Sequence, residues 1–512
     1  MRQLIIVICS AALASTAAAQ AGGGHEHAGP PPQRLGRVSF PTTCRPAAQP
    51  AFERGVALLH SFWYEEASVS FGKSVGVDSN CALGYWGVAM SALHPLWTPP
   101  GAAEARDASG AAERAVQLSR PGSRDRDYAE AIAAYYRDYA GADHKTGLLA
   151  YERAMAGVAE RHPKDDEARI FHALALIANG QNDGDTSFAR QRRAGAILEP
   201  LFARRPDHPG LAHYLIHAYD SPALASRGVK AAGRYAAIAP SVPHAQHMPS
   251  HIYVWIGRWD DVITSNRRSA ESSRRFEESK GVAALWDQRG HALDYLMYAY
   301  LQQGRDAEAR ALAVQAAGVT AVFPENTLTN AYALAAIPAR YALERNDWAA
   351  AETLTVRPAS AWLGAEAVTH FARALGGARR GNATLAGAEV DTLGQLEAAL
   401  GNAGGTQTYW SGQARIQRLA ASAWLARAKG DTVGALQLGA EAADLEDVTE
   451  KHPVTPGSVL PARELYGDLL LELGHPAKAR LAYEASLARQ PLRARSLAGL
   501  AAARKALRIS NR

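Results

Sequence analysis

The sequence predicts an all-α protein built from repeated pairs of antiparallel helices. Three observations support this fold class: the composition, a recurring turn, and a spacing of 34 residues between similar segments. The 512-residue chain is rich in Ala, Leu and Arg, poor in β-branched residues, and 47% hydrophobic. This composition favours helices over strands. Because stacked repeats extend one continuous core, a chain of this length need not divide into separate globular domains.

Five turns of one form mark the predicted helical pairs. Each has Gly or Asn where the first helix must end in a left-handed residue, and a small or β-branched residue five positions later, where the second helix packs closely on the first. These turns begin at Gly257, Gly304, Asn346, Gly430 and Gly474. Residues 52–71 fit the same plan near the N-terminus.

The chain begins with Met1-Arg2, an apolar run and the small-residue stretch Ala17-Ala18-Ala19, which is typical of a secretory signal peptide. We therefore expect residues 1–19 to be removed and the mature protein to be periplasmic or secreted. Residues 20–43 are expected to be a disordered leader, because the Gly- and Pro-rich start offers no apolar face to bury. No later apolar run approaches the roughly 20 residues that a membrane span needs.

The remaining chain is expected to form one long array and a shorter one. Residues 44–375 are predicted as an N-terminal array of helical repeats that carries most of the histidines, residues 376–408 as an irregular linker or insertion, and residues 409–512 as C-terminal repeats with capping helices. Outside the signal peptide the chain has two cysteines, Cys44 and Cys81. In an oxidising compartment they most simply form one disulfide, and a free buried pair is the alternative.

Three segments within residues 207–298 carry polar residues in matching register. The first has His213, His217 and Asp220, the second His244, His247 and His251, and the third His291, Asp294 and Tyr298. The first and second segments are offset by 34 residues, at both His213 to His247 and His217 to His251. The third segment keeps the spacing of the second at an offset of 47 residues, one repeat plus a 13-residue insertion. This stretch holds seven of the 17 histidines.

A 34-residue period of helix-turn-helix units resembles the tetratricopeptide repeat (TPR) family. The resemblance implies that the first helix of each repeat lines a concave groove, into which its second, fifth, ninth and twelfth positions point. With the register set by the turns at Gly257 and Gly304, the three segments should form a polar ladder facing this groove. The motif His247-Met-Pro-Ser-His251 also looks like a group of exported bacterial TPR proteins, which implies export and fold but no reaction.

The spacing inside the segments predicts a metal site. His213, His217 and Asp220 are at i, i+4 and i+7 and so share one helix face. Paired imidazoles with a nearby carboxylate are ligands of Zn²⁺, Cu²⁺ and non-haem Fe²⁺. We predict a divalent transition metal bound by residues from this set: His213, His217, Asp220, His244, His247 and His251. The motif is not that of a zinc protease, because Tyr214 stands where a catalytic Glu is needed.

Other interpretations remain open at this point. A single histidine on a repeat helix is more often a satisfied core residue, although six in register make ordinary packing a weaker explanation. His291 and Asp294 can form an oriented general base, with Tyr298 as donor or acid, but no nucleophile accompanies them. The protein can also be a scaffold that binds an extended peptide or a partner protein in the groove. No basic run with interleaved aromatics supports nucleic-acid binding.

Overall fold

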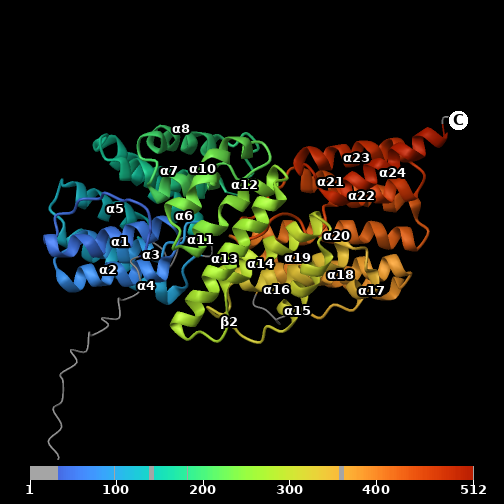
Figure 1. Ribbon diagram of the computed structural model, residues 1–512, viewed down its shortest axis with the longest axis horizontal. Helices are drawn as coiled ribbons and strands as arrows, with labels where there is room; N and C mark the ends of the chain where they lie inside the picture. The colour runs from blue at the N-terminus through green and yellow to red at the C-terminus, as the bar shows by residue number, and fades with distance from the viewer. Residues whose placement is uncertain (1–32, 97–98, 138–142, 182, 357–361, 511–512) are drawn as a thin grey trace, which may run out of the picture. The chain divides into compact units, whose positions relative to one another are not determined.

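The computed structural model describes residues 33–96, 99–137, 143–181, 183–356 and 362–510 of the chain. Helices make up most of these residues and follow one another as helical hairpins (Figure 1). The predicted fold class, an all-α, TPR-like helical-hairpin solenoid, is confirmed. The predicted signal peptide, residues 1–19, lies outside the described residues.

The N-terminal helices each pack on the next helix in sequence. They are η1, a 3-10 helix (Pro46–Ala48), α1 (Gln49–His60), α2 (Tyr64–Val77), α3 (Ala82–Ser91), α4 (Ala102–Leu118), α5 (Arg124–Tyr136), α6 (His144–Arg161), α7 (Asp166–Gly180) and α8 (Ala189–Arg204). The side chains of Ser123, Asp143 and Asp165 accept hydrogen bonds from the first backbone N–H groups of α5, α6 and α7. Such caps satisfy donors that have no partner within the helix and so define where each helix begins.

The middle helices carry the three histidine segments. They are α9 (Pro209–Ala218), α10 (Ala225–Ile238), α11 (Pro243–His247), α12 (Pro249–Trp255), α13 (Trp259–Lys280), α14 (Asp287–Gln302), α15 (Asp306–Ala317) and α16 (Leu328–Glu344). Proline opens α9, α11 and α12, where its missing N–H costs no helical hydrogen bond. The expected insertion is accommodated by the 22-residue α13 and by strand β1 (Leu285–Trp286), which pairs in parallel with β2 (Val322–Phe323).

The C-terminal helices continue the same pattern. They are α17 (Trp348–Glu352), α18 (Leu363–Arg380), α19 (Ala383–Ala403), α20 (Gln407–Ala428), α21 (Thr432–Asp447), α22 (Ala462–Glu472), α23 (Pro476–Arg489) and α24 (Ala494–Ser510). All five predicted turn residues have positive φ, from 55° at Asn346 to 83° at Gly430. The turns therefore end their helices as the sequence indicates.

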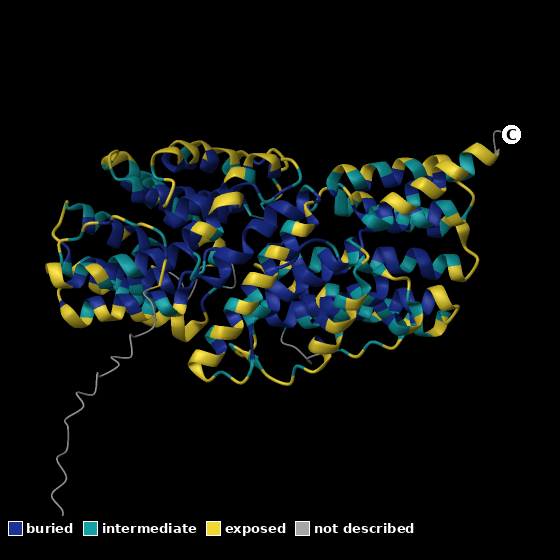
Figure 2. Cartoon of the chain, viewed as in Figure 1, coloured by how far each residue is buried: buried dark blue, intermediate teal, exposed yellow. Residues whose placement is uncertain are grey.

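Alternate helices stack into a layer of their own. Contacts join α7 to α9, α9 to α12, α11 to α14, α14 to α16, and so on in steps of two to α24. Buried residues lie along the helix faces that meet inside the array, and exposed residues lie on the outer faces (Figure 2). The histidine-bearing helices α9, α11, α12 and α14 are thus successive neighbours in one layer, as the repeat register implies.

The region 376–408 is not the irregular linker that we expected. It contains the end of α18, a turn at Gly381 with φ of 80°, and the 21-residue α19, which together form an ordinary hairpin. Its glycines permit close packing: a Cβ at Gly376 would overlap the backbone of Glu352. No domain boundary falls here, because residues 34–512 form one compact unit.

The described part of the predicted leader is ordered, which contradicts the expectation of disorder for residues 33–43. Phe40 is fully buried, and its ring centroid lies 5.3 Å from that of Phe52 and 5.5 Å from that of Trp86. Phe40 and the buried Leu35 therefore anchor this segment on the core. The predicted disulfide between Cys44 and Cys81 is confirmed. Among the helices of the described residues, none combines the length and apolar character needed to cross a membrane.

Candidate metal centre

Consecutive first helices bring six histidines together. His213 and His217 lie on α9, His244 and His247 on α11, His251 on α12, and His291 on α14. All six side chains are buried, with exposed fractions between 0% and 7%. Because α9 touches α12 and α11 touches α14, side chains on the shared face of these helices meet in the interior. They gather as two groups of three.

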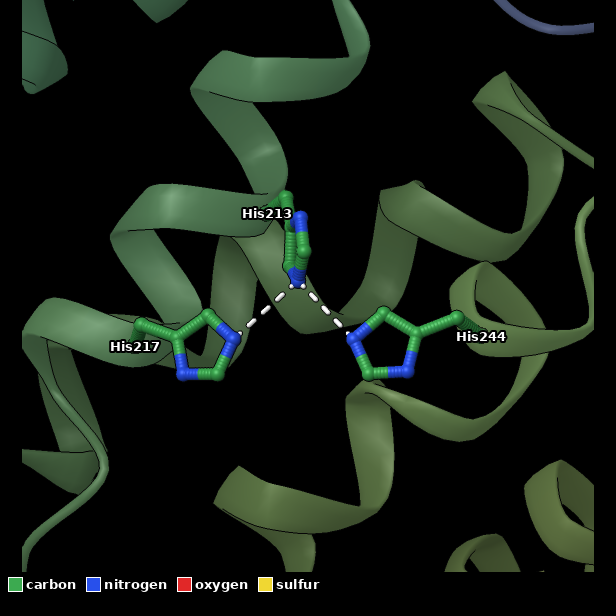
Figure 3. Close-up of side chains that lie close together, drawn as sticks. All are labelled: His213, His217 and His244. Atoms are coloured by element: carbon green, nitrogen blue, oxygen red, sulfur yellow. Dashed lines mark hydrogen bonds between the residues drawn. The ribbon is translucent and has the colours of Figure 1, made fainter. Parts of the chain in front are cut away.

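The first group consists of His213, His217 and His244 (Figure 3). The Nε2 atom of His213 lies 3.1 Å from that of His217 and 3.2 Å from that of His244. Aromatic rings cover the group: Tyr235 stacks on His213 with centroids 5.0 Å apart, and Phe62 contacts the same imidazole at 4.3 Å. Three nitrogens from two helices therefore face one another in a site walled by rings.

The second group consists of His247, His251 and His291. The Nε2 atoms of His247 and His251 lie 2.9 Å apart. The ring of His291 lies 4.2 Å from that of His247, centroid to centroid. In each group, one nitrogen of every histidine lies within 4.8 Å of the other two. Each group is therefore compact enough for its three side chains to share one ion.

Hydrogen bonds of the opposite ring nitrogens orient the imidazoles. The Nδ1 atom of His213 lies 2.7 Å from the carbonyl oxygen of His60, to which it must donate. The Nδ1 atom of His251 lies 2.8 Å from a carboxylate oxygen of Asp220 and donates in the same way. Since a neutral imidazole carries one proton, donation from Nδ1 leaves a lone pair on Nε2.

A third contact of this kind orients His247 in the second group. The Nδ1 atom of His247 lies 2.5 Å from Oδ1 of Asn266, whose Nδ2 donates to the carbonyl oxygen of Val262 at 2.8 Å. That second bond turns the amide oxygen of Asn266 towards His247. The Nε2 atoms of His247 and His251 thus both carry lone pairs and face each other at 2.9 Å. Two facing lone pairs repel each other, and a cation between them removes this repulsion.

Burial disfavours a proton as that cation. It lowers the pKa of three of these histidines to about 3 and holds the pKa of the other three well below 6.5. The first three are His217, His244 and His247, and the others are His213, His251 and His291. Burial penalises a charged imidazole, and repulsion from neighbouring positive groups adds to the shift. All six imidazoles are therefore neutral near pH 7, which is the form that coordinates metal ions.

The nitrogen spacing fits metal coordination. Two nitrogen ligands that each lie about 2.0–2.1 Å from a tetrahedral Zn²⁺ are about 3.3 Å from each other. The separations of 3.1 and 3.2 Å in the first group and 2.9 Å in the second are within about 0.4 Å of that value. Each group can thus supply three ligands to one ion and leave a fourth position for another ligand.

Asp220 is not placed as a metal ligand, contrary to the prediction. Helix α9 ends at Ala218, so Asp220 leaves the helix face that carries the histidines. Its Oδ2 atom accepts hydrogen bonds from His251 and from Nζ of Lys451, each at 2.8 Å, and its Oδ1 atom accepts one from Nε1 of Trp255 at 2.7 Å. With both oxygens engaged, Asp220 orients His251 from outside the ligand set.

The structure does not assemble His291, Asp294 and Tyr298 into an acid–base group. Nε of Arg340 donates to Oδ1 of Asp294 at 2.8 Å, and both side chains are fully buried. Nη1 of Arg493 donates to the hydroxyl of Tyr298 at 3.2 Å. Asp294 and Tyr298 therefore hold buried arginines, and His291 joins His247 and His251 in the second group instead.

The loop between α21 and α22 closes one side of the second group. Nη2 of Arg340 donates to Oγ1 of Thr455 in this loop at 2.8 Å. The hydroxyl of Tyr295 donates to the carbonyl oxygen of Thr455 at 3.1 Å and lies 3.4 Å from Nε2 of His251. Lys451, the partner of Asp220, belongs to the same loop. A segment that is distant in sequence thus covers the histidines.

Several residues that shape the site were missed by sequence reasoning. Asn266 lies on α13 and reaches His247 only because α11 packs on α13. Lys451 contacts Asp220 across 231 residues of chain. Phe62 adopts a left-handed backbone, with φ of 54°, which is unfavourable for a bulky side chain and which the surrounding contacts must stabilise. No local sequence pattern signals any of these contacts.

A third group, formed by His60, Glu167 and His208, is a complete hydrogen-bond network. The Nε2 atoms of the two histidines each lie 2.9 Å from a different carboxylate oxygen of Glu167. The backbone N–H of Leu211 donates to Nδ1 of His208 at 3.3 Å, and the Tyr214 hydroxyl lies 3.0 Å from Nδ1 of His60. Each histidine here donates through Nε2 and accepts through Nδ1, so the group is satisfied without a metal ion.

No protein-family model and no curated protein matches the chain. Solved structures do match: the APC/C Cut9–Hcn1 hetero-tetramer is 13% identical with a TM-score of 0.36, over 89% of this chain and 76% of that chain. The human IFIT1 dimer with PPP-AAAA is 12% identical with a TM-score of 0.36 over 77% and 81%, and yeast Tom70 is 11% identical with a TM-score of 0.35 over 91% and 96%. Similarity this low says nothing about a partner or an activity of this chain. The class of protein is a TPR-like helical solenoid with two buried three-histidine groups.

Proposed function

We propose that this protein is an exported, TPR-like helical protein that binds divalent transition metal ions through its six buried histidines. The observation that carries the proposal is the pair of Nε2 lone pairs of His247 and His251, which face each other at 2.9 Å. Hydrogen bonds from both Nδ1 atoms hold this orientation, and burial disfavours a bridging proton. A metal ion is the species that satisfies both nitrogens.

Zinc, copper and iron are the candidate metals, since neutral imidazole suits all three. The proposed ligands are His213, His217 and His244 in the first group and His247, His251 and His291 in the second. Asp220, Asn266 and the carbonyl oxygen of His60 support them from outside by accepting Nδ1–H hydrogen bonds. Contacts of this kind fix the tautomer and raise the basicity of the coordinating nitrogen.

Two features support the export part of the proposal. Residues 1–19 have the sequence pattern of a secretory signal peptide. The disulfide between Cys44 and Cys81 is of a kind that persists in oxidising compartments and is rare in the cytosol. Fractionation of cells that express the full chain tests this part: a periplasmic or secreted location is expected, and retention in the cytoplasm would contradict it.

Elemental analysis of protein purified from its native compartment tests metal binding. The wild-type chain should carry metal that the double variant His217→Ala, His251→Ala lacks, because each group then loses one of its three ligands. His172→Ala is the matched control, since His172 is also a buried histidine but lies on α7 outside both groups. Circular dichroism should show that all three proteins are folded. Equal metal content in the wild-type and double-variant proteins would count against the site.

A peptide-binding scaffold is the second candidate function, and one pocket favours it. Its lining includes Trp255, Tyr409 and Trp410, and its Arg463 and Arg489 pair with Asp447 and Glu450 of the same lining. Aromatic rings in such a pocket suit the apolar side chains of an extended peptide. Binding of apolar peptides that is weakened by Trp410→Ala, while the metal content stays unchanged, would support this function.

A further inference from the structure

We propose that the two histidine groups together hold a pair of neighbouring copper ions, one in each group, which enter as Cu⁺. This inference rests on the proposed metal site of the six histidines: it specifies the number and the identity of the bound ions, and it gives them one positive charge on entry in place of two. Each group offers three buried imidazoles drawn from two or more helices. The arrangement of the groups, their donor atoms and the charges around them each support the pair.

The two groups are in direct contact. The ring centroids of His217 and His251 lie 5.8 Å apart, and those of His244 and His247 lie 6.0 Å apart. Each of these ring pairs joins a member of the first group to a member of the second. Ions held by the two groups are therefore neighbours within one site.

One short helix links the two histidine groups. Helix α11 supplies His244 to the first group and His247 to the second. Because His244 and His247 are three residues apart on this helix, the two groups are held at a fixed separation.

The donor set narrows the choice of metal. Each group offers only neutral nitrogen ligands, and the nearest carboxylate, Asp220, orients His251 from outside. Non-haem Fe²⁺ sites usually include a carboxylate ligand, and Mg²⁺, Ca²⁺ and Mn²⁺ prefer oxygen. Copper and zinc remain, and copper binds such nitrogen sites more strongly in the general affinity order of divalent metals.

The charge of the surroundings favours a monovalent ion. The negative charges next to the second group are already paired: Asp220 with Lys451 at 2.8 Å, and Asp294 with Arg340 at 2.8 Å. Nothing in the ligand set offsets the positive charge of two neighbouring ions. Their mutual repulsion scales with the product of the two charges, so it is about fourfold smaller for two monovalent ions than for two divalent ones. Of zinc, copper and iron, only copper has a stable monovalent state.

Anaerobic loading of the full chain with Cu⁺ tests the pair. We expect two copper ions per chain to bind, and one in each of the variants His244→Gln and His291→Gln. After oxidation in air, two neighbouring Cu²⁺ ions interact through their magnetic dipoles, so the wild-type EPR spectrum should be broadened or split. The single-copper variants should show the unbroadened spectrum of an isolated Cu²⁺ ion. His172→Gln, outside both groups, should behave as the wild type.

Several outcomes would overturn the inference without removing the metal site. These are one copper ion per chain, two ions with the unbroadened EPR spectrum of isolated Cu²⁺, or stronger binding of Zn²⁺ than of Cu⁺ in direct competition. If the wild-type chain and the double variant His217→Ala, His251→Ala both bind no metal at all, the proposed function fails as well. The wild-type stoichiometry and competition data need no variant, so they decide the question even if a substitution prevents folding.

Discussion

Metal affinity should change little when the pH is lowered from about 7 to about 5.5. An ordinary histidine ligand has a pKa of about 6.5 and loses about eightfold in affinity over this range, so three such ligands lose about 600-fold. Here burial lowers the pKa of His217, His244 and His247 to about 3. These imidazoles stay neutral at both pH values, and protons compete with the metal only as the pH falls towards about 3.

Competition titration against a chelator at both pH values measures this effect, after correction for protonation of the chelator itself. We expect an affinity change of less than about tenfold and almost no proton release on binding. The charged groups that face His251 are Asp220, 2.8 Å from its Nδ1 atom, and Lys451, which pairs with Asp220 at 2.8 Å. Unfolded histidines take up protons near pH 6.5 and the buried ones do not, so stability decreases as the pH falls. Circular dichroism must therefore show folded protein at both pH values. A loss of several hundredfold in affinity would refute the reasoning.

Three substitutions test the surroundings of the site. Asp220→Asn removes the carboxylate that accepts from His251, and metal affinity should fall by about 10- to 100-fold in the same titration, whereas unchanged affinity would rule out an orienting role. Arg340→Met leaves Asp294 buried without its partner, and urea unfolding should show a loss of about 3–5 kcal/mol, whereas a loss below about 1 kcal/mol would contradict the importance of this pair. Cys81→Ser removes a disulfide whose cysteines are 37 residues apart, and the free energy of unfolding should fall by about 4 kcal/mol. A reducing agent should cause the same loss in the wild-type protein and no further loss in the variant, and a larger effect on the variant would contradict this assignment.

The repeat spacing in the sequence predicted much of the fold and part of the candidate site. The turns at Gly257, Gly304, Asn346, Gly430 and Gly474 predicted where helices end, because a left-handed residue there is a local requirement. The region around residues 376–408 misled the prediction for a reason that is also physical. Glycine reads as a helix breaker in sequence, but at Gly376 it allows two backbones to approach, and this depends on a neighbour that the local sequence does not reveal.

For the polar residues too, the sequence predicted some features and tertiary packing decided others. The periodicity placed His213, His217, His244, His247, His251 and His291 on one helix layer, since residues that share a helix face follow from spacing alone. Their division into two groups depended on how α11 sits between α9 and α14. Asp294 follows the same register, yet it pairs with Arg340, 46 residues away.

The amino-acid order therefore determined which side chains point inwards, and it did so through helical periodicity and local turn chemistry. Tertiary packing decided which of those side chains meet a partner. Asp220 and Asn266 became supports for histidines, and Phe62 became a cover, through contacts between segments far apart in the chain. A buried polar group takes whatever partner the packing brings within hydrogen-bond distance, and that distance is a property of the folded chain rather than of any one segment.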